Sequence, residues 1–186
     1  MCTALDRVFP GAKLVDFDYA TPWGTGSLSD NGGRPTLLIF LRYYGCTICQ
    51  LDLANLKARY GEITAAGGRA LVVLQSDGAG IAAQIGPDHF PFELICDPDQ
   101  ALYRRFGVAP ALSMEKMASA AVLKKIGAAR AAGFTHGAYE GNELQLPAVL
   151  MLDAGLTVRK AHYGANPGDL PPVDEMAAWL SGKESK

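Results

Sequence analysis

Apolar residues along this chain gather in short runs that predict buried strands. Residues 36–41 are hydrophobic after a first threonine, which is typical of a strand covered on both faces of a mainly parallel sheet. Residues 69–74 form a second apolar run, and residues 92–95 form a shorter one. We expect residues 36–41 to be the central strand of the sheet.

A stripe with a different period follows the first run and predicts a helix. Its apolar members are spaced alternately by three and four residues, and they are Cys46, Cys49, Leu53, Leu56, Tyr60 and Ile63. This helix is expected to end near Gly67 and Gly68, because glycine readily takes the left-handed conformation of a C-terminal cap. Three further helices are expected at residues 98–106, 112–132 and 172–181.

Turn-forming residues mark the regions near both ends of the chain. Residues 13–33 are rich in glycine, proline, aspartate and asparagine, so they are expected to form an N-terminal extension of short extended pieces joined by turns. Residues 148–152 and 157–163 are two predicted strands joined by one tight turn, and such strands must be antiparallel. With the alternating strands and helices before them, they predict an α/β fold with a mixed sheet.

Length and composition are those of an ordinary globular protein. The 186 residues are 49% hydrophobic, and we expect one domain over residues 1–186 with a helical insertion at about 107–145. The net charge of −2 predicts neither nucleic acid nor an anionic membrane as a partner. The sequence contains neither a secretory signal nor a run of about eighteen apolar residues, so we expect a cytoplasmic protein without a membrane span.

The pair Cys46 and Cys49 carries the strongest chemical signal. The two thiols stand at the start of a predicted helix, immediately beyond the carboxyl end of a buried strand. The positive end of the helix dipole and its free N–H groups stabilise a thiolate, which is the reactive form of cysteine. We therefore predict that Cys46, at the outer tip, attacks a substrate and that Cys49 resolves the product. Arg42 either lowers the pKa of Cys46 or is a surface charge at the strand end.

Other chemistries for these cysteines fit the sequence less well. A zinc site would need two more ligands, and the other cysteines and the histidines are scattered without ligand spacing, so we expect no metal. Two unconnected core cysteines remain possible. A separate pattern, Gly78-x-Gly80-x-x-Ala83 with Asp97 after the next strand, is close to a dinucleotide-binding fingerprint, although Pro87 shortens its helix. We expect no bound cofactor.

The residues around the cysteine pair also resemble a known family. Residues 40–50 and the helix after them are similar to thioredoxin-like proteins of the peroxiredoxin-like group related to alkyl hydroperoxide reductase. The resemblance extends through residues 70–75, 96–103 and 145–153 and covers most of the chain from about Gly11 onward. It implies a three-layer thioredoxin-like fold with an N-terminal hairpin and an insertion. It also implies that Pro147 is the loop proline that is cis in thioredoxin folds and faces the thiols.

The motif departs from the best-known branch of that family. Typical peroxiredoxins carry Pro-x-x-x-Thr-x-x-Cys, and counting back from Cys49 puts Cys46 at the threonine position and Arg42 at the proline position. Counting back from Cys46 finds Tyr43 and Ile39 instead. We therefore expect a thiol–disulfide oxidoreductase or peroxiredoxin-like antioxidant protein that uses the Cys46–Cys49 dithiol. The alternatives are a thiol peroxidase whose peroxidatic residue is Cys49 and a thioredoxin-fold binding module without turnover.

The expected partners follow from this chemistry. The substrate is a disulfide or a peroxide, and an external dithiol donor returns the pair to its reduced form. Tyr43, Tyr44 and Thr47, with Trp23, are expected to line the approach to Cys46, or in the case of the aromatic residues to pack around the strand end. Met114 and Met117, at the start of the insertion, are expected in the core, with an adaptable docking surface as the alternative. The sequence does not indicate an oligomeric state.

Overall fold

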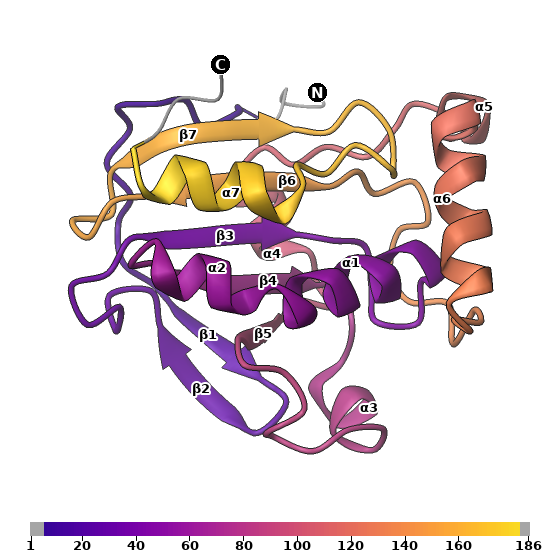
Figure 1. Ribbon diagram of the computed structural model, residues 1–186, viewed down its shortest axis with the longest axis horizontal. Coiled ribbons are helices and arrows are strands. Elements are labelled where there is room, and N and C mark those ends of the chain that lie inside the picture. The colour runs from indigo at the N-terminus through magenta and orange to yellow at the C-terminus, as the bar shows by residue number, and fades with distance from the viewer. Residues whose placement is uncertain (1–5, 183–186) are drawn as a thin grey trace.

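The computed structural model describes residues 6–182, and its strands form one mixed sheet (Figure 1). The strand order is β2-β1-β5-β4-β3-β6-β7. The strands are β1 (Asp18–Thr21), β2 (Gly24–Ser27), β3 (Thr36–Phe40), β4 (Arg69–Leu74), β5 (Glu93–Cys96), β6 (Ala148–Leu152) and β7 (Val158–Tyr163). β4 is parallel to β3 and β5, whereas β6 is antiparallel to β3 and β7. The predicted central strand and mixed sheet are confirmed.

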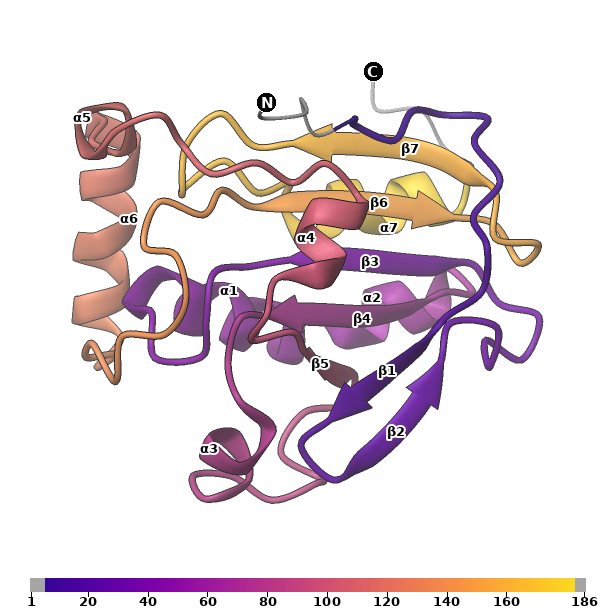
Figure 2. The ribbon, with the colours of Figure 1, turned by 180° about the vertical axis from the view of Figure 1, so that it is seen from behind.

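Helices cover both faces of this sheet, which gives the expected three layers. One face carries α1 (Thr47–Ala58), α2 (Tyr60–Ala65) and α7 (Val173–Leu180), as Figure 1 shows. The opposite face carries α4 (Ala101–Arg105), as Figure 2 shows. The remaining helices are α3 (Gly78–Ala82) near the hairpin, and α5 (Met114–Met117) and α6 (Ala120–Ala131) beyond the carboxyl end of β3. The thioredoxin-like fold class is confirmed, with its N-terminal extension and helical insertion.

The alternation of side chains along β3 explains why the strand is apolar throughout. Leu37, Ile39 and Leu41 belong to the core beneath α1, α2 and α7. Leu38 and Phe40 point to the other face, into the core that includes residues of α4 and the N-terminal segment. A strand covered on both faces buries every side chain, so its hydrophobic pattern is continuous.

The N-terminal segment reaches both sides of the sheet. Its hairpin β1–β2 adds to β5 through the pairing of Ala20 with Cys96. The buried guanidinium of Arg69 holds the chain after the hairpin by donating to the carbonyl oxygens of Leu28 (2.8 Å) and Asp30 (2.9 Å). Residues 11–14 run along the start of β7 at the opposite side of the sheet.

Two helices differ from their predicted bounds for identifiable reasons. The stripe after Cys46 forms two helices, because Arg59 leaves the helical conformation (φ −111°, ψ 14°). Its guanidinium pairs with Glu62 on α2 and Asp174 on α7. The helix expected from residue 98 begins at Ala101, because the Asp97 carboxylate accepts hydrogen bonds from the first N–H groups of α4.

The insertion is helical as expected, but its two methionines differ. Met117 is buried, whereas Met114 is 63% exposed, so the prediction that both lie in the core is wrong for Met114. The short helix α5 turns only one of its faces to the protein, which leaves the other in solvent. Within residues 6–182, no helix combines the length and the apolar character needed to cross a membrane.

Candidate active site

Both thiols lie where β3 gives way to α1. Cys46 is the N-cap residue of this helix, and its Sγ accepts a hydrogen bond from the backbone N–H of Cys49 at 3.4 Å. Both side chains are buried, and Cys46 has no exposed surface at all. The expectation that Cys46 projects from the outer tip is therefore wrong. A segment far along the chain covers it, which local helical periodicity could not predict.

Arg42 makes a direct contact with the first thiol. Its Nη2 lies 3.1 Å from Cys46 Sγ, and its Nη1 donates to the backbone carbonyl of Glu143 at 2.6 Å. The Arg42 side chain is only 15% exposed, so it is not the surface charge that was one of the two interpretations. Within the described chain, Arg42 Nε and Glu143 Oε1 are buried atoms without a hydrogen-bond partner. The cation and the thiol therefore share a site that is largely shielded from water.

These contacts separate the two thiols chemically. The side-chain hydrogen bond from the Cys49 thiol, opposed by burial and assisted by the charge of Arg42, lowers the pKa of Cys46 to about 6. Burial, together with the hydrogen bond to Cys46 and the charge there, raises the pKa of Cys49 well above its ordinary value. At neutral pH the arrangement favours a thiolate on Cys46 and a protonated thiol on Cys49.

A strap formed by residues 133–145, between α6 and β6, closes over this site. Gly137 N–H donates to the carbonyl of Gly45 at 2.8 Å, and a Cβ on Gly45 would stand 2.6 Å from the carbonyl oxygen of Ala138. Further along the strap, Asn142 N–H donates to the Gln75 side chain at 2.7 Å. The strap is thus fastened next to the Cys46 helix start and at the end of β4.

Sequence reasoning missed the residues that hold the strap. Gln75 and Ser76 follow an apolar strand, and Ser76 accepts the N–H of Tyr44 and donates to Glu140 at 2.6 Å. Two polar residues directly after a buried strand are the signal that could have revealed them. Glu140 itself carried no signal, since an acidic residue in a polar loop is ordinary.

The predicted approach residues are distributed around the thiol rather than gathered at one opening. Tyr43 is completely buried, and its hydroxyl hydrogen-bonds to His136 of the strap at 2.9 Å. Tyr44 lines a different pocket, against Lys57 and Phe90. Trp23 belongs to a pocket beside the N-terminal hairpin.

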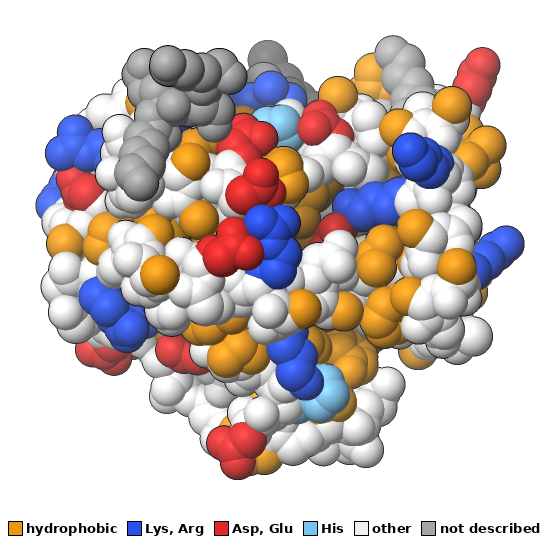
Figure 3. Space-filling view, viewed as in Figure 1, with side chains coloured by type: hydrophobic (Ala, Val, Ile, Leu, Met, Phe, Trp, Pro, Cys, Tyr) orange, Lys and Arg blue, Asp and Glu red, His pale blue; other side chains and the backbone are white. Residues whose placement is uncertain are grey.

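Thr47 does lie at an opening near the thiols. With Arg42 and Ile48 it forms one wall of a groove of about 430 Å³, whose other wall comes from the insertion. Most of the insertion side chains in this groove are apolar: Met114, Met117, Ala118, Val122, Leu123 and Ile126. Hydrophobic side chains also gather over α6 on the face seen in Figure 3. The groove therefore joins an apolar surface to the residues that adjoin Cys46.

Pro147 lies beside the second thiol. It lines a cavity of about 10 Å³ together with Cys49, Asp52 and Gln145, among others. The peptide bond before Pro147 is trans, so the cis geometry implied by the family resemblance is wrong. The two isomers of an X–Pro bond differ intrinsically by about 1 kcal/mol, so the surrounding structure decides between them.

The structure also bears on the alternative chemistries. Gly78 of the dinucleotide-like pattern packs against Pro22 and Cys96, where an added Cβ would lie 3.3 to 3.4 Å from their atoms. The carboxylate of Asp97 caps α4. This loop is packed against other parts of the protein and does not form the phosphate cradle of a dinucleotide site. Burial raises the pKa of Cys96 to about 11, and Cys2 lies outside the described residues. Over residues 6–182, no cluster of three or more potential metal ligands occurs.

Known proteins resemble this chain in sequence and in fold. A curated relative, prostamide/prostaglandin F synthase of Salmo salar, is 25% identical over 150 residues, which cover 79% of this chain and 74% of the relative. Peroxidoxin BcpB from Mycobacterium tuberculosis has a similar fold, with a TM-score of 0.65, 14% identity and coverage of 95% of this chain and 98% of that chain. The reduced 2-Cys peroxiredoxin of Plasmodium vivax gives a TM-score of 0.66 at 13% identity, covering 93% of this chain and 80% of that chain. The model of the AhpC/TSA family matches residues 9–161, so the chain belongs to that family.

Proposed function

We propose that this peroxiredoxin-like thiol oxidoreductase attacks its substrate with the Cys46 thiolate and resolves the product with Cys49. The contact that carries the proposal is the one between Arg42 Nη2 and Cys46 Sγ at 3.1 Å. With the N–H of Cys49, it places two donors on a sulfur that has no exposed surface. Such donors stabilise a charged thiolate and not a neutral thiol, so Cys46 is the better nucleophile of the pair.

The family implies a peroxide or disulfide substrate and a thiol reductant, and both substrates lead to the same final state. With a peroxide, the Cys46 sulfur bonds to one oxygen, the O–O bond breaks, and the departing oxygen takes a proton, which leaves a sulfenic acid on Cys46. With a disulfide, the thiolate displaces one sulfur and forms a mixed disulfide. Cys49 then attacks the Cys46 sulfur and expels water or a thiol. The external dithiol finally gives two electrons and two protons to the Cys46–Cys49 disulfide.

The burial of Cys46 adds a requirement for this cycle. The strap, residues 133–145, has to move aside before a substrate can reach the sulfur. Its fastenings to Gly45 and Gln75 are a few hydrogen bonds, which local opening of a loop can break. The groove next to Arg42 and Thr47 is the adjoining entry.

The environment of Cys49 argues against its being the peroxidatic residue. Cys49 is buried, and its raised pKa keeps it protonated at neutral pH. A protonated thiol is a poor nucleophile toward a peroxide or a disulfide. A binding module without turnover would have no use for a stabilised thiolate beside a second thiol.

The apolar groove favours a bulky organic peroxide over hydrogen peroxide as a second, more specific candidate substrate. Five of its insertion residues are large and apolar, and Arg42 and Arg130 lie on its lining as cations. The relative from Salmo salar is named prostamide/prostaglandin F synthase. This candidate requires faster turnover of cumene hydroperoxide than of hydrogen peroxide, lost when Leu123→Asp places a charge in the groove.

Trapping of the mixed disulfide tests the assignment of the two cysteines. Cys46→Ser and Cys49→Ser are each mixed with glutathione disulfide and analysed by mass spectrometry, with Cys96→Ser as the matched control. We expect Cys49→Ser to hold one glutathione on Cys46, because no thiol remains to displace it. If Cys46→Ser traps glutathione and Cys49→Ser does not, the roles are reversed. If neither variant traps glutathione and the parent shows no thiol–disulfide exchange, the hypothesis of a binding module without turnover is correct.

A further inference from the structure

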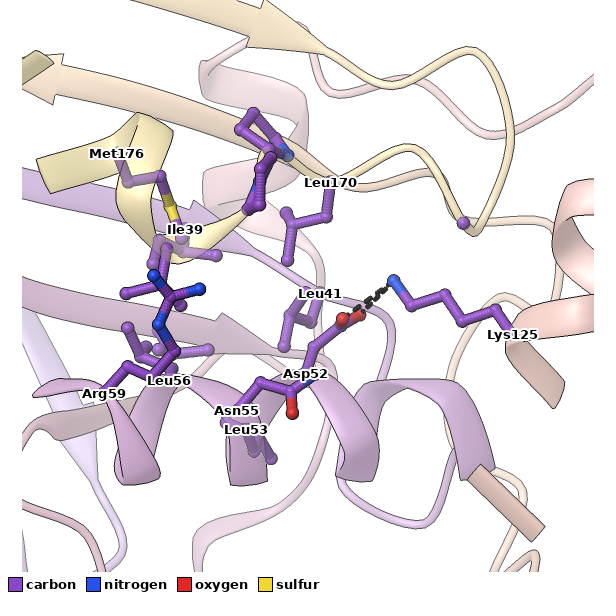
Figure 4. Close-up of a pocket in the computed structure, with 15 residues that line it drawn as sticks. Ile39, Leu41, Asp52, Leu53, Asn55, Leu56, Arg59, Lys125, Leu170 and Met176 are labelled. Carbon is purple, nitrogen blue, oxygen red and sulfur yellow. Dashed lines mark hydrogen bonds and ion pairs between the residues drawn. The ribbon is translucent and has the colours of Figure 1, made fainter. Parts of the chain in front are cut away.

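Asp52 carries a largely buried carboxylate one helical turn beyond Cys49. Residues three positions apart lie on the same side of an α-helix, so Asp52 follows Cys49 along the inner side of α1. Both residues line the cavity of about 10 Å³ that also contacts Pro147, and this cavity has room for one bridging water. Asp52 also lines a larger pocket of about 390 Å³, shown in Figure 4. It therefore stands between the second thiol and a wider opening.

The charged groups around Asp52 are few. Lys125 reaches over from α6, and its Nζ lies 2.7 Å from one carboxylate oxygen and 2.9 Å from the other, as Figure 4 shows. Arg42 shares the small cavity with Asp52, and Arg59 lies at the far end of the larger pocket. The residues of α7 and of the segment before it that line this pocket carry no charge. The Asp52 side chain is only 9% exposed, so its ionisation is decided by these neighbours and by burial.

The resolving step needs a proton acceptor at this place. Cys49 is protonated at rest, and it must lose its proton to attack the Cys46 sulfur. Arg42, the other charged group that lines the small cavity, is a cation that accepts no proton, and Cys49 is only 4% exposed to water. Asp52 is the carboxylate on that lining.

We propose that Asp52 accepts the proton of Cys49 during the resolving step and releases it to solvent through the larger pocket, and that Lys125 is a positioning residue that keeps Asp52 ionised. This inference rests on the proposed function, in which Cys49 resolves. The Cys49 S–H bond breaks and its proton passes to the carboxylate. The Cys49 sulfur then bonds to the Cys46 sulfur, and the thiol or oxygen held there leaves with the bonding electrons and takes up a proton.

The electrostatics agree with an acceptor that is active near neutral pH. Burial, with a smaller contribution from the charge on Cys46, raises the pKa of Asp52 to about 6, while the charge and hydrogen bond of Lys125 act in the opposite direction. Asp52 is therefore ionised and able to accept above about pH 6, and it becomes protonated and unable to accept below it. Loss of the Lys125 charge raises this midpoint, since an ammonium favours the carboxylate.

A coloured disulfide separates the two steps in one experiment. 5,5′-Dithiobis(2-nitrobenzoate) releases one nitrothiobenzoate when Cys46 attacks it and a second when Cys49 resolves the mixed disulfide, and both are followed by stopped-flow absorbance. The parent protein carries Cys2→Ser and Cys96→Ser, so only the pair reacts. We expect Asp52→Asn to keep the rate of the first phase within about twofold of the parental rate at pH 7. The rate of the second phase should fall by about 100-fold. Asp52→Glu should restore part of the lost rate, whereas Asn55→Ala, in the same pocket, should change neither phase.

The pH dependence of the second phase distinguishes a proton acceptor from a structural residue. Because Cys46 is then bound in a mixed disulfide, its own titration no longer contributes. The Cys46 charge, which helps to raise the pKa of Asp52 at rest, is also absent in this state, so we expect a midpoint at or below about pH 6 in the parent. The midpoint should lie about one pH unit higher in Lys125→Met than in the parent, with an unchanged first phase. The inference is overturned if both variants keep the parental second phase and midpoint. If Asp52→Asn does not fold, the midpoint of Lys125→Met alone tests the inference, and an unchanged midpoint overturns it. A first phase that survives Cys46→Ser would instead overturn the proposed function.

Discussion

The pKa of Cys46 is the most direct measure of whether the site works as described. A thiol with a pKa of about 6 is roughly nine-tenths thiolate at pH 7, whereas one at 9 would be about one-hundredth. Replacement of Arg42 by methionine removes a cation 3.1 Å from the sulfur and keeps most of the side-chain volume. An opposite charge at this distance typically changes a pKa by about 1 to 3. Because the N–H of Cys49 remains, we expect the pKa of Cys46 to rise by about 1 to 2 in Arg42→Met. The thiolate fraction at pH 7 then falls to between about one-half and one-tenth.

Ultraviolet absorbance of the thiolate gives this pKa without requiring reagent access to a buried sulfur. The titration is recorded for the parent, for Arg42→Met and for Arg104→Met, with Cys46→Ser as the blank. Arg104 belongs to α4, the helix on the opposite face of the sheet. We expect midpoints near pH 6 for the parent and for Arg104→Met, and between about 7 and 8 for Arg42→Met. A parental midpoint above 8, or an unchanged midpoint in Arg42→Met, would refute the reasoning.

Three further substitutions test other parts of the structure. Gly45→Ala should push the strap away, because its Cβ would meet the carbonyl of Ala138, and iodoacetamide should then alkylate Cys46 several-fold faster; Gly61→Ala, at an open position, is the control. Arg69→Met removes the buried donor that holds the N-terminal hairpin and should lower the free energy of unfolding in urea by about 3 kcal/mol. Tyr103→Phe removes a buried hydroxyl that donates to two strand carbonyls and should cost about 1 to 2 kcal/mol in the same assay. Unchanged alkylation or unfolding would show that these contacts are not made in solution.

The fold was predictable because its strands have unusually clear patterns. A strand buried on both faces, such as β3, requires continuous apolar residues, and the antiparallel β6–β7 pair requires only a tight turn between two extended segments. The helix bounds were harder to predict, because they depend on side chains that form hydrogen bonds and ion pairs at the helix ends. Arg59 ends α1 by bonding to groups on two other helices, and Asp97 delays α4 by capping it.

The site was predictable only as far as local geometry reaches. The positions of Cys46 and Cys49 follow from the strand and helix that carry them, and their contact with Arg42 follows from the short turn between these elements. The burial of Cys46 does not follow from local geometry, because the strap that covers it lies about ninety residues away in sequence. Lys125 is 73 residues away from Asp52 in the sequence, so local geometry could not predict their ion pair either.

The N-terminal segment has a consequence for solubility. The sheet has two outer strands, β2 and β7, and exposed strand edges can pair with other chains. The hairpin supplies β2 itself and covers the edge of β5, while Gly11, Ala12 and Leu14 exchange backbone hydrogen bonds with residues 156–158 at the start of β7. One stretch of chain therefore covers both the edge of β5 and the start of β7. Deletion of residues 6–28 would open two edges together, so the shortened protein is expected to aggregate even though both redox thiols remain in place.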